Sequence, residues 1–282
     1  MKYLLTLIFA IICIFGLCQV QATEGELLEP VHPQDGIYQA PRIMYGYTAQ
    51  PKQFPHMCSL LNRKSSGYTL CGGSLISSRH ILTAAHCVAS VISTTVGCGT
   101  VDRQQPYLQV VTSVNVAHPN YNPTTLNNDI AIWTLPITVN SDPYVKPIRL
   151  PTVSQAKQTF EGVTATVSGF GRYSTTTTSS SQILRYVDVR IIANSLCAQN
   201  YGTTVIVDST LCSLGYEFDE QGTCNGDSGS PMIIQEGTEK TQIAVTSFVS
   251  SKGCGSDRPT GFVRTASFLS WINQVTGIAL RY

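Results

Sequence analysis

The sequence has little charge, and it lacks the patterns that several protein classes need. Only 12% of its 282 residues are charged, and its formal net charge is +1. No basic block and no basic stripe interleaved with aromatic residues is present, which argues against nucleic acid as a partner. No Cys-x-x-Cys or His-x-x-x-His spacing suggests zinc, and neither a metal nor another cofactor is expected. Asn122 precedes Pro123, which leaves no usable N-glycosylation site.

A long apolar run occurs only at the start of the chain, where it is short for a bilayer span. Lys2 is followed by an almost unbroken apolar run over residues 4–17, and residues 20–22 (VQA) have the small-residue pattern of a cleavage site. This arrangement is typical of a secretory signal peptide. A single membrane anchor is the alternative, but no basic stop-transfer cluster follows the run. We therefore predict that residues 1–22 are a signal peptide, that the protein is secreted and extracellular, and that it has no membrane partner.

Secretion changes the meaning of the cysteine count. Of the ten cysteines, Cys13 and Cys18 lie in the predicted signal peptide, and eight remain. The eight are Cys58, Cys71, Cys87, Cys98, Cys197, Cys212, Cys224 and Cys254. An even number of cysteines in a secreted chain predicts disulfides, here four.

The next segment differs from the rest of the chain in composition. Residues 23–42 are acidic at first, contain three prolines, and end at Arg42 immediately before apolar Ile43. We predict a pro-segment over residues 23–42, with cleavage after Arg42, and one functional domain over residues 43–282.

From residue 43 onward the sequence is typical of β-structure. Runs rich in Val, Ile, Thr and aromatic residues alternate with turn residues, and the clearest predicted strands are 107–116, 130–135, 163–168, 183–192 and 242–250. Residues 174–181 are all Ser or Thr, which predicts an exposed loop, with O-glycosylation as an open alternative. Helical periodicity is good only near the C-terminus, where Phe268, Trp271, Ile272 and Val275 share one face before Gly277.

Three short motifs contain the residue types of a nucleophilic site. They are LTAAHC with His86, NNDIAIWTL with Asp129, and CNGDSGSP with Ser228. A serine hydroxyl needs a neighbouring base, and histidine suits that task because its pKa lies near neutral pH. A buried carboxylate can then hold the imidazole in the required tautomer. Each motif alone is also compatible with an ordinary turn or surface residue.

Together with CGGSLIS (71–77), SGFG (168–171) and TSFVS (246–250), these motifs resemble the trypsin/chymotrypsin family of serine proteases, in particular secreted arthropod chymotrypsin- and elastase-like members. The resemblance runs from Ile43 to about Ile278, and the order His, Asp, Ser is that of the family. It implies an all-β fold of two six-stranded antiparallel β-barrels with a C-terminal α-helix. It also implies a serine endopeptidase whose catalytic residues are His86, Asp129 and Ser228.

The resemblance implies further roles around the serine. The backbone N–H groups of Gly226 and Ser228 would form the oxyanion hole, and glycine suits position 226 because a Cβ would interfere. After cleavage, the α-amino group of Ile43 would pair with Asp227 and act as an activation latch. The expected partners are protein or peptide substrates, a protease that cleaves after Arg42, and protein inhibitors of proteases. The expected oligomeric state is a monomer.

Disulfide pairing also follows from the resemblance. It implies the bridges Cys71–Cys87, Cys197–Cys212 and Cys224–Cys254. Cys58 and Cys98 are not standard in the family, and we predict that they pair with each other. Intermolecular pairing is the alternative for these two cysteines.

The same resemblance assigns a pocket for the side chain before the cut. Gly222 would form its floor, Val249 and Thr260 would narrow its wall, and residues 247–249 (Ser247, Phe248, Val249) would pair with the substrate backbone. An uncharged, narrowed pocket predicts small to medium apolar residues before the cut, with graded selectivity. Larger apolar residues such as Leu, Phe or Tyr remain open.

Two departures from the family pattern bear directly on the site and its activation. Ser230 stands where the family has glycine, and it would be strained if the backbone there has a positive φ. Tyr45 follows the new N-terminus closely and needs room when the latch inserts. A catalytically silent family member that only binds is the alternative from another functional class. A lipase-type esterase is not indicated, because no strand, Gly-x-Ser-x-Gly and helix occur in succession.

Overall fold

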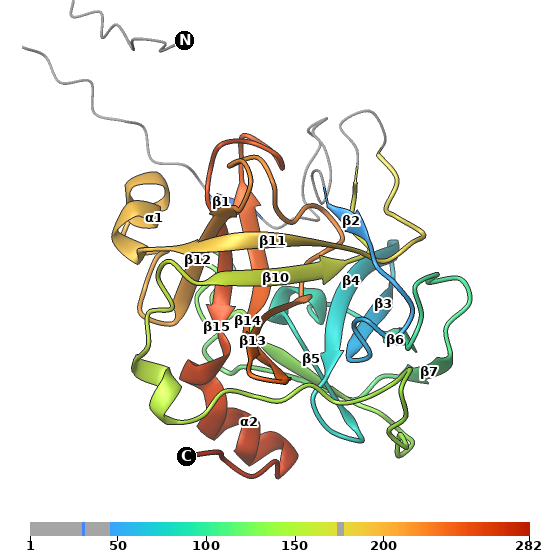
Figure 1. The fold of residues 1–282 in the computed structure, drawn as a ribbon. Coiled ribbons are helices and arrows are strands. Elements are labelled where there is room, and N and C mark those ends of the chain that lie inside the picture. The colour runs from blue at the N-terminus through green and yellow to red at the C-terminus, as the bar shows by residue number, and fades with distance from the viewer. Residues whose placement is uncertain (1–29, 32–45, 174–177) are drawn as a thin grey trace, which may run out of the picture.

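The structure is a computed structural model, and it describes residues 30–31, 46–173 and 178–282 (Figure 1). Nearly all regular structure in these residues is antiparallel β-sheet, arranged as two sheets with few helices. The predicted signal peptide, Ile43, Tyr45 and most of the predicted pro-segment lie outside the described residues. Among the described residues, no helix has both the length and the apolar character needed to cross a membrane.

The first sheet has the strand order β7-β6-β3-β4-β5-β9-β8. Its strands are β3 (Met57–Lys64), β4 (Gly67–Leu75), β5 (His80–Thr83), β6 (Ser93–Cys98), β7 (Leu108–Thr112), β8 (Asn115–Ala117) and β9 (Ala131–Thr134). Its two ends, β7 and β8, are joined directly by residues 113–114, so the sheet curls back on itself as a barrel.

The single strand expected over residues 107–116 is therefore interrupted. At the break, Thr112 Oγ1 donates to Thr134 O (2.6 Å) and accepts from the N–H of Val114 (3.2 Å). The threonine hydroxyl thus takes over hydrogen bonds that a continuous strand would make through its backbone. If β7 and β8 are counted as one interrupted strand, the first barrel has the six strands that were expected.

The second sheet closes through hydrogen bonds. Its strands are β10 (Thr164–Gly169), β11 (Arg185–Ile192), β12 (Thr210–Gly215), β13 (Pro231–Glu236), β14 (Glu239–Ser250) and β15 (Thr260–Arg264). The order is β14-β13-β10-β11-β12-β15, and β15 pairs again with β14, which completes a six-stranded barrel. Two short strands are added outside this ring: β1 (Pro30–Val31) on β14 and β2 (Tyr47–Thr48) on β11.

The C-terminal helix forms close to where the periodicity predicts it. It is α2 (Leu269–Thr276), preceded by a 3-10 turn over Thr265–Phe268, and it ends at Gly277, whose φ is 72°. The left-handed conformation at this position favours glycine and stops the helix. Phe268 and Ile272 are buried against the apolar core that includes most of the first barrel.

A second helix, α1 (Asn194–Tyr201), is absent from the sequence prediction. Only Cys197 and Tyr201 on it are buried, so it has almost no amphipathic pattern. The disulfide to Cys212 of β12 fixes it instead. The Ser/Thr tract is exposed at Thr178 and Ser179, as expected, whereas its last residue, Ser181, is buried and its hydroxyl donates to Ile183 O. Residues 174–177 lie outside the described residues.

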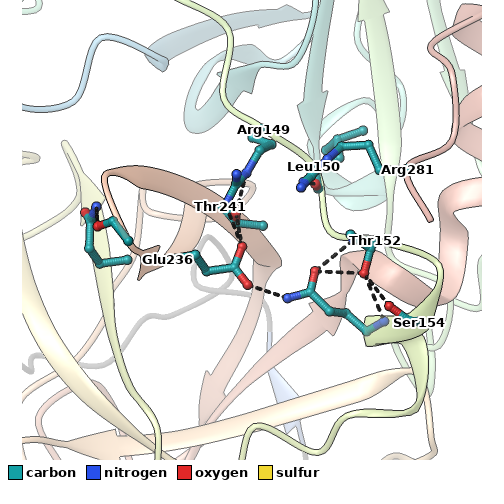
Figure 2. A network of polar contacts seen from close by, with 10 residues as sticks. Arg149, Leu150, Thr152, Ser154, Glu236, Thr241 and Arg281 are labelled. Atoms are coloured by element: carbon teal, nitrogen blue, oxygen red, sulfur yellow. Dashed lines mark hydrogen bonds and ion pairs between the residues drawn. The ribbon is translucent and has the colours of Figure 1, made fainter.

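A polar network fastens the connection between the barrels to the second sheet (Figure 2). Glu236 at the end of β13 accepts hydrogen bonds from Arg149 (2.7 Å), Gln155 and Thr241. The hydrogen bond from Thr241 and those from its other partners lower the pKa of Glu236 below the ordinary carboxyl value. Arg281 in the C-terminal segment donates to Leu150 O. The connecting segment therefore has fixed contacts with β13, β14 and the chain end.

Candidate active site

His86 lies at the rim of the first barrel, in a 3-10 turn over Ala85–Cys87 that follows β5. Its side chain is buried. Its backbone N–H donates to Asp129 Oδ1 (2.9 Å), and its ring Nδ1 lies 2.7 Å from Asp129 Oδ2. A carboxylate can only accept, so the proton of the neutral ring lies on Nδ1. Nε2 is then the basic nitrogen, which is the tautomer that general-base catalysis requires.

Asp129 is fully buried two residues before β9, after Asn128 with its positive φ of 59°. Besides the two hydrogen bonds from His86, its Oδ2 accepts one from Ser247 Oγ of β14 (2.7 Å). A buried carboxylate is costly unless hydrogen bonds compensate for the lost water, and three donors do so here. Because Ser247 belongs to the second barrel, both barrels hold this carboxylate. The hydroxyl of Ser247 is a contribution that the sequence analysis missed, since only its backbone was considered.

Ser228 lies in the turn before β13 and is buried. Its carbonyl oxygen accepts a hydrogen bond from the N–H of Gly72 in β4 (2.7 Å), and Cys87 Sγ lies 3.6 Å from the same oxygen. Gly229 has a φ of 80°, and a Cβ there would lie 2.5 Å from Gly72 O and 3.1 Å from Ala84 N. Only glycine lets the serine turn approach the first barrel this closely. The turn therefore docks on the residues that flank His86.

The backbone at Gly226 has a conformation that suits the expected oxyanion hole. Gly226 has a φ of 95°, and a Cβ there would lie 3.0 Å from the Cα of Gly171. Between the two expected donors, the N–H of Asp227 turns back to Cys224 O (2.9 Å). Within the described part of the chain, the N–H groups of Gly226 and Ser228 donate to no backbone carbonyl. The conformation at position 226 is one that favours glycine, in line with the physical reason given for that residue.

The strain considered for Ser230 does not arise. Ser230 is not among the described residues with a positive φ, and the left-handed position in this turn is Gly229 instead. Ser230 is fully buried, and its Oγ lies only 1.9 Å from where a Cβ on Gly72 would be. The first glycine of the CGGSLIS motif thus provides the room that this serine needs.

Asp227 is fully buried beside the catalytic serine. Its Oδ1 accepts from the N–H of Gly171 (2.8 Å) and its Oδ2 from the N–H of Cys224 (2.9 Å). Burial raises the pKa of Asp227 to about 7 despite these two bonds. No cationic side chain in the described ranges forms an ion pair with it. Its predicted partner, the amino group of Ile43, lies outside the described residues.

The residues expected to form the specificity pocket line one cavity. Gly222, Val249 and Thr260 all contact it, together with Thr223, Ser250 and Cys254, and its volume is about 10 Å³, room for one water molecule. A Cβ on Gly222 would lie 3.4 Å from Thr260 Oγ1, so these two residues face each other. Two of the charged residues that line the cavity have other partners. Asp219 pairs with Arg190 at 3.6 Å, and Arg258 pairs with Asp257 at 3.2 Å.

Phe248 lies on the same strand as Ser247 and Val249 but packs elsewhere. Its ring contacts that of Tyr201 in α1 edge-on, with 5.2 Å between the ring centroids. A Cβ on Gly261 would lie 2.1 Å from this ring, so the neighbouring strand leaves room for it by having glycine. Phe248 thus fixes the strand on which Val249 narrows the cavity.

Four disulfides are present: Cys58–Cys98, Cys71–Cys87, Cys197–Cys212 and Cys224–Cys254. The second joins β4 to the residue after His86, and the fourth joins the serine turn to the pocket wall. Cys71, His86 and Cys87 offer ligand atoms within 4.8 Å of one another. Because the two cysteines are bonded to each other, this cluster has no thiolate to bind a metal ion.

Two antiparallel barrels, with a histidine–aspartate pair on one and a serine turn from the other docked beside it, define a serine hydrolase of the trypsin-like fold. Comparison with known proteins gives the family. The Trypsin family model matches residues 43–272, and the chain belongs to the trypsin family of serine proteases. It is therefore a hydrolase that cleaves peptide bonds in proteins or peptides.

Individual relatives agree with this assignment. Collagenase from Hypoderma lineatum is 39% identical over 238 residues, covering 84% of this chain and 88% of the relative. Brachyurin from Leptuca pugilator is 34% identical, covering 84% of this chain and 99% of the relative. The solved structure of HL collagenase superposes with a TM-score of 0.77 at 36% identity, covering 84% of this chain and all of that one.

Proposed function

We propose that this protein is a secreted serine endopeptidase, made as a zymogen and activated by cleavage after Arg42. The observation that carries the proposal is the buried His86–Asp129 pair with the Ser228 turn docked on the residues around it. The signal-peptide pattern and the four disulfides support secretion. Residues 1–22, 23–42 and 43–282 are then signal peptide, pro-segment and protease domain.

In the proposed mechanism, Ser228 Oγ attacks the scissile carbonyl carbon while His86 Nε2 takes the hydroxyl proton. Asp129, which already accepts from Nδ1, stabilises the imidazolium that results. The N–H groups of Gly226 and Ser228 stabilise the oxyanion of the tetrahedral intermediate. His86 then gives its proton to the leaving amine, and an acyl group remains on Ser228. A water molecule, deprotonated by His86, releases that acyl group by the same steps.

The cavity residues support a preference for small to medium apolar side chains before the cut. Gly222 brings no charge to the floor, and Val249 and Thr260 narrow the wall. A buried carboxylate would be needed to pair with Arg or Lys there, and Asp219 is already paired with Arg190 near the surface. Selectivity among apolar side chains should be graded, since one methylene changes binding by only ~1–3 kcal/mol.

The test is to produce the precursor, cleave it after Arg42, and confirm that the new N-terminus is Ile43. Turnover is then compared on matched peptides with Ala or Val, Leu or Phe, and Arg before the cut. Native collagen joins this panel because one relative bears the name collagenase. We expect Ala and Val peptides to be cut fastest, and fastest turnover on Arg would overturn the proposed pocket.

The alternative is a catalytically silent member of the family that acts by binding. The hydrogen-bonded His86–Asp129 pair favours the enzyme, because a silent member has no need of it. Absence of turnover on every peptide, with Ile43 confirmed as the N-terminus, would favour the silent protein. The His86→Ala variant, prepared in the same way, gives the background rate for this decision.

A further inference from the structure

The C-terminal end of β14 pairs with a short strand, β1, from the predicted pro-segment, which is called the leader below. β1 pairs antiparallel with β14, with Pro30 opposite Ser250 and Val31 opposite Val249. Figure 1 shows β1 beside β14. The strands β13 and β15 pair with β14 only as far as Phe248. Residues 30–31 therefore occupy backbone positions of β14 that no other described strand uses.

The register identifies which backbone groups are exchanged. Opposite residues in an antiparallel pair alternate between exchanging two hydrogen bonds and exchanging none. Proline has no N–H, so the pair of Pro30 and Ser250 cannot be the hydrogen-bonded one. Val31 and Val249 are then the pair that exchanges both bonds. These are the groups of Val249 that, under the proposed function, would pair with the backbone of a substrate.

The direction of β1 leads toward the catalytic residues. In an antiparallel pair, rising numbers in β1 correspond to falling numbers in β14, so the strand runs from Ser250 toward Ser247. The hydroxyl of Ser247 is hydrogen-bonded to Asp129 at 2.7 Å. Addition of an extended segment to a sheet edge obtains its affinity from main-chain hydrogen bonds, which any sequence with the right backbone can provide.

We propose that residues 30–31 compete with the substrate for the Val249 edge while the chain is uncut. This inference rests on the proposed function, since it uses the same edge. Because residues 30–31 belong to the same chain as β14, a short linker gives them an effective concentration in the millimolar range. Weak pairing with Val249 is therefore enough to keep this edge occupied. No cysteine lies between Cys18 and Cys58, so cleavage after Arg42 leaves the leader without a covalent link. The released segment then dissociates by dilution, and the edge becomes available.

The test compares two substitutions at one position in the precursor of residues 23–282. Val31→Pro removes the N–H that Val249 O accepts, whereas the matched control Val31→Ala keeps it. All forms carry Arg42→Gln, so that none is cleaved after that residue. Amide hydrogen exchange reports on the Val249 N–H, and residual turnover of an Ala-containing peptide gives KM and kcat separately.

We expect the Val249 amide to be protected in the parent and in Val31→Ala, and to exchange faster in Val31→Pro. In the proline variant KM should fall about three- to tenfold with kcat unchanged, because a tethered competitor has been weakened. Equal exchange at Val249 in all forms would overturn the contact, and faster exchange without a change in KM would overturn the competition. Turnover by the cleaved enzyme, which lacks the leader, tests the proposed function separately.

Discussion

The two halves of the active site differ in how complete they are. The half from the first barrel, His86 and Asp129, is joined by two direct hydrogen bonds of 2.9 and 2.7 Å. The half from the second barrel contains Asp227, which is buried without a described cationic partner, and a pocket of only about 10 Å³. The hydrogen bonds of the first half come entirely from described residues, whereas Asp227 in the second half has no ion-pair partner among the described residues and is proposed to pair with Ile43. Activation should therefore act on the second half only.

This difference has a physical origin in the two carboxylates. Asp129 accepts three hydrogen bonds, one of them from the imidazole, and those bonds compensate for its burial. Asp227 accepts only two backbone N–H groups, and its pKa rises to about 7. A carboxylate that is hard to ionise in one state and paired with an ammonium in another is suited to act as a switch.

Removing the nucleophile should have the largest effect. Ser228→Ala is expected to lower kcat/KM of the cleaved enzyme by about 10⁵–10⁶-fold, and His86→Ala by a similar factor. The double variant should be no slower than either single variant, because the residues act as one unit. Peptide turnover measures these effects, and additive losses would contradict a shared mechanism.

Asp227→Asn should impair the second half of the active site and leave the first half unchanged. In the cleaved enzyme it removes the proposed partner of Ile43, and we expect a loss of roughly 10²–10³-fold in kcat/KM, in line with breaking a buried ion pair. The hydrogen bonds of His86 to Asp129 should be unaffected, which the NMR signal of the Nδ1 proton can show. A cleaved variant with full activity would exclude the latch.

The same residue makes the stability of the uncut precursor depend on pH. Its pKa is raised from 3.8 to about 7, so the folded state binds more protons than the unfolded state between these values. This contribution is fully present below pH 3.8 and is lost as pH rises through about 7, on the order of 4 kcal/mol in total. Urea unfolding at pH 5 and pH 8 should show the loss in the precursor and not in Asp227→Asn.

Widening the pocket should change the selectivity for the side chain before the cut and leave the His86–Asp129 pair unchanged. Val249→Gly is expected to raise the kcat/KM ratio of Phe over Ala peptides by about 10–100-fold, because the branched side chain no longer narrows the wall. Val249→Ala should give an intermediate ratio. An unchanged ratio in both variants would show that other residues limit the pocket.

The polar network in the connecting segment should affect stability alone. Glu236 is about one-third exposed and shares its carboxylate among three donors. Glu236→Gln should lower the free energy of unfolding by about 1 kcal/mol at pH 7, since hydrogen bonds to a charged group are weakened. The difference should shrink as pH falls through the lowered pKa of Glu236. Glu239→Gln on the exposed end of β14 is the matched control, and equal kcat/KM in all three proteins is expected.

Much of the fold could be predicted from the sequence because local patterns matched their elements. The strands over 130–135, 163–168 and 242–250 lie within one to three residues of β9, β10 and β14. The helix α1 could not be predicted, because a disulfide and two buried residues hold it rather than an apolar face. The break at residues 113–114 depends on one threonine hydroxyl that a period-two pattern does not reveal.

The candidate site was predictable in its residue types but not in its contacts. The order of the motifs predicts a common site for His86, Asp129 and Ser228. Nothing in the sequence indicates that Ser247 donates a hydrogen bond to Asp129. Strain at Ser230 was expected only if its φ were positive, and that condition is not met, since φ is set by the whole turn and the glycine requirement falls on Gly229. Ser230 packs against Gly72, which lies far from it in the sequence, and a local sequence pattern does not reveal such a contact.

The hydrogen bonds to the carboxylate of Asp129 depend on how the two barrels are positioned relative to each other. Its hydrogen-bond donors come from two separate barrels, His86 on one and Ser247 on the other. A slip of one barrel past the other by about an ångström would lengthen at least one of those bonds beyond a useful distance. Heat inactivation of the cleaved enzyme should accordingly begin below the temperature at which its β-sheet signal is lost.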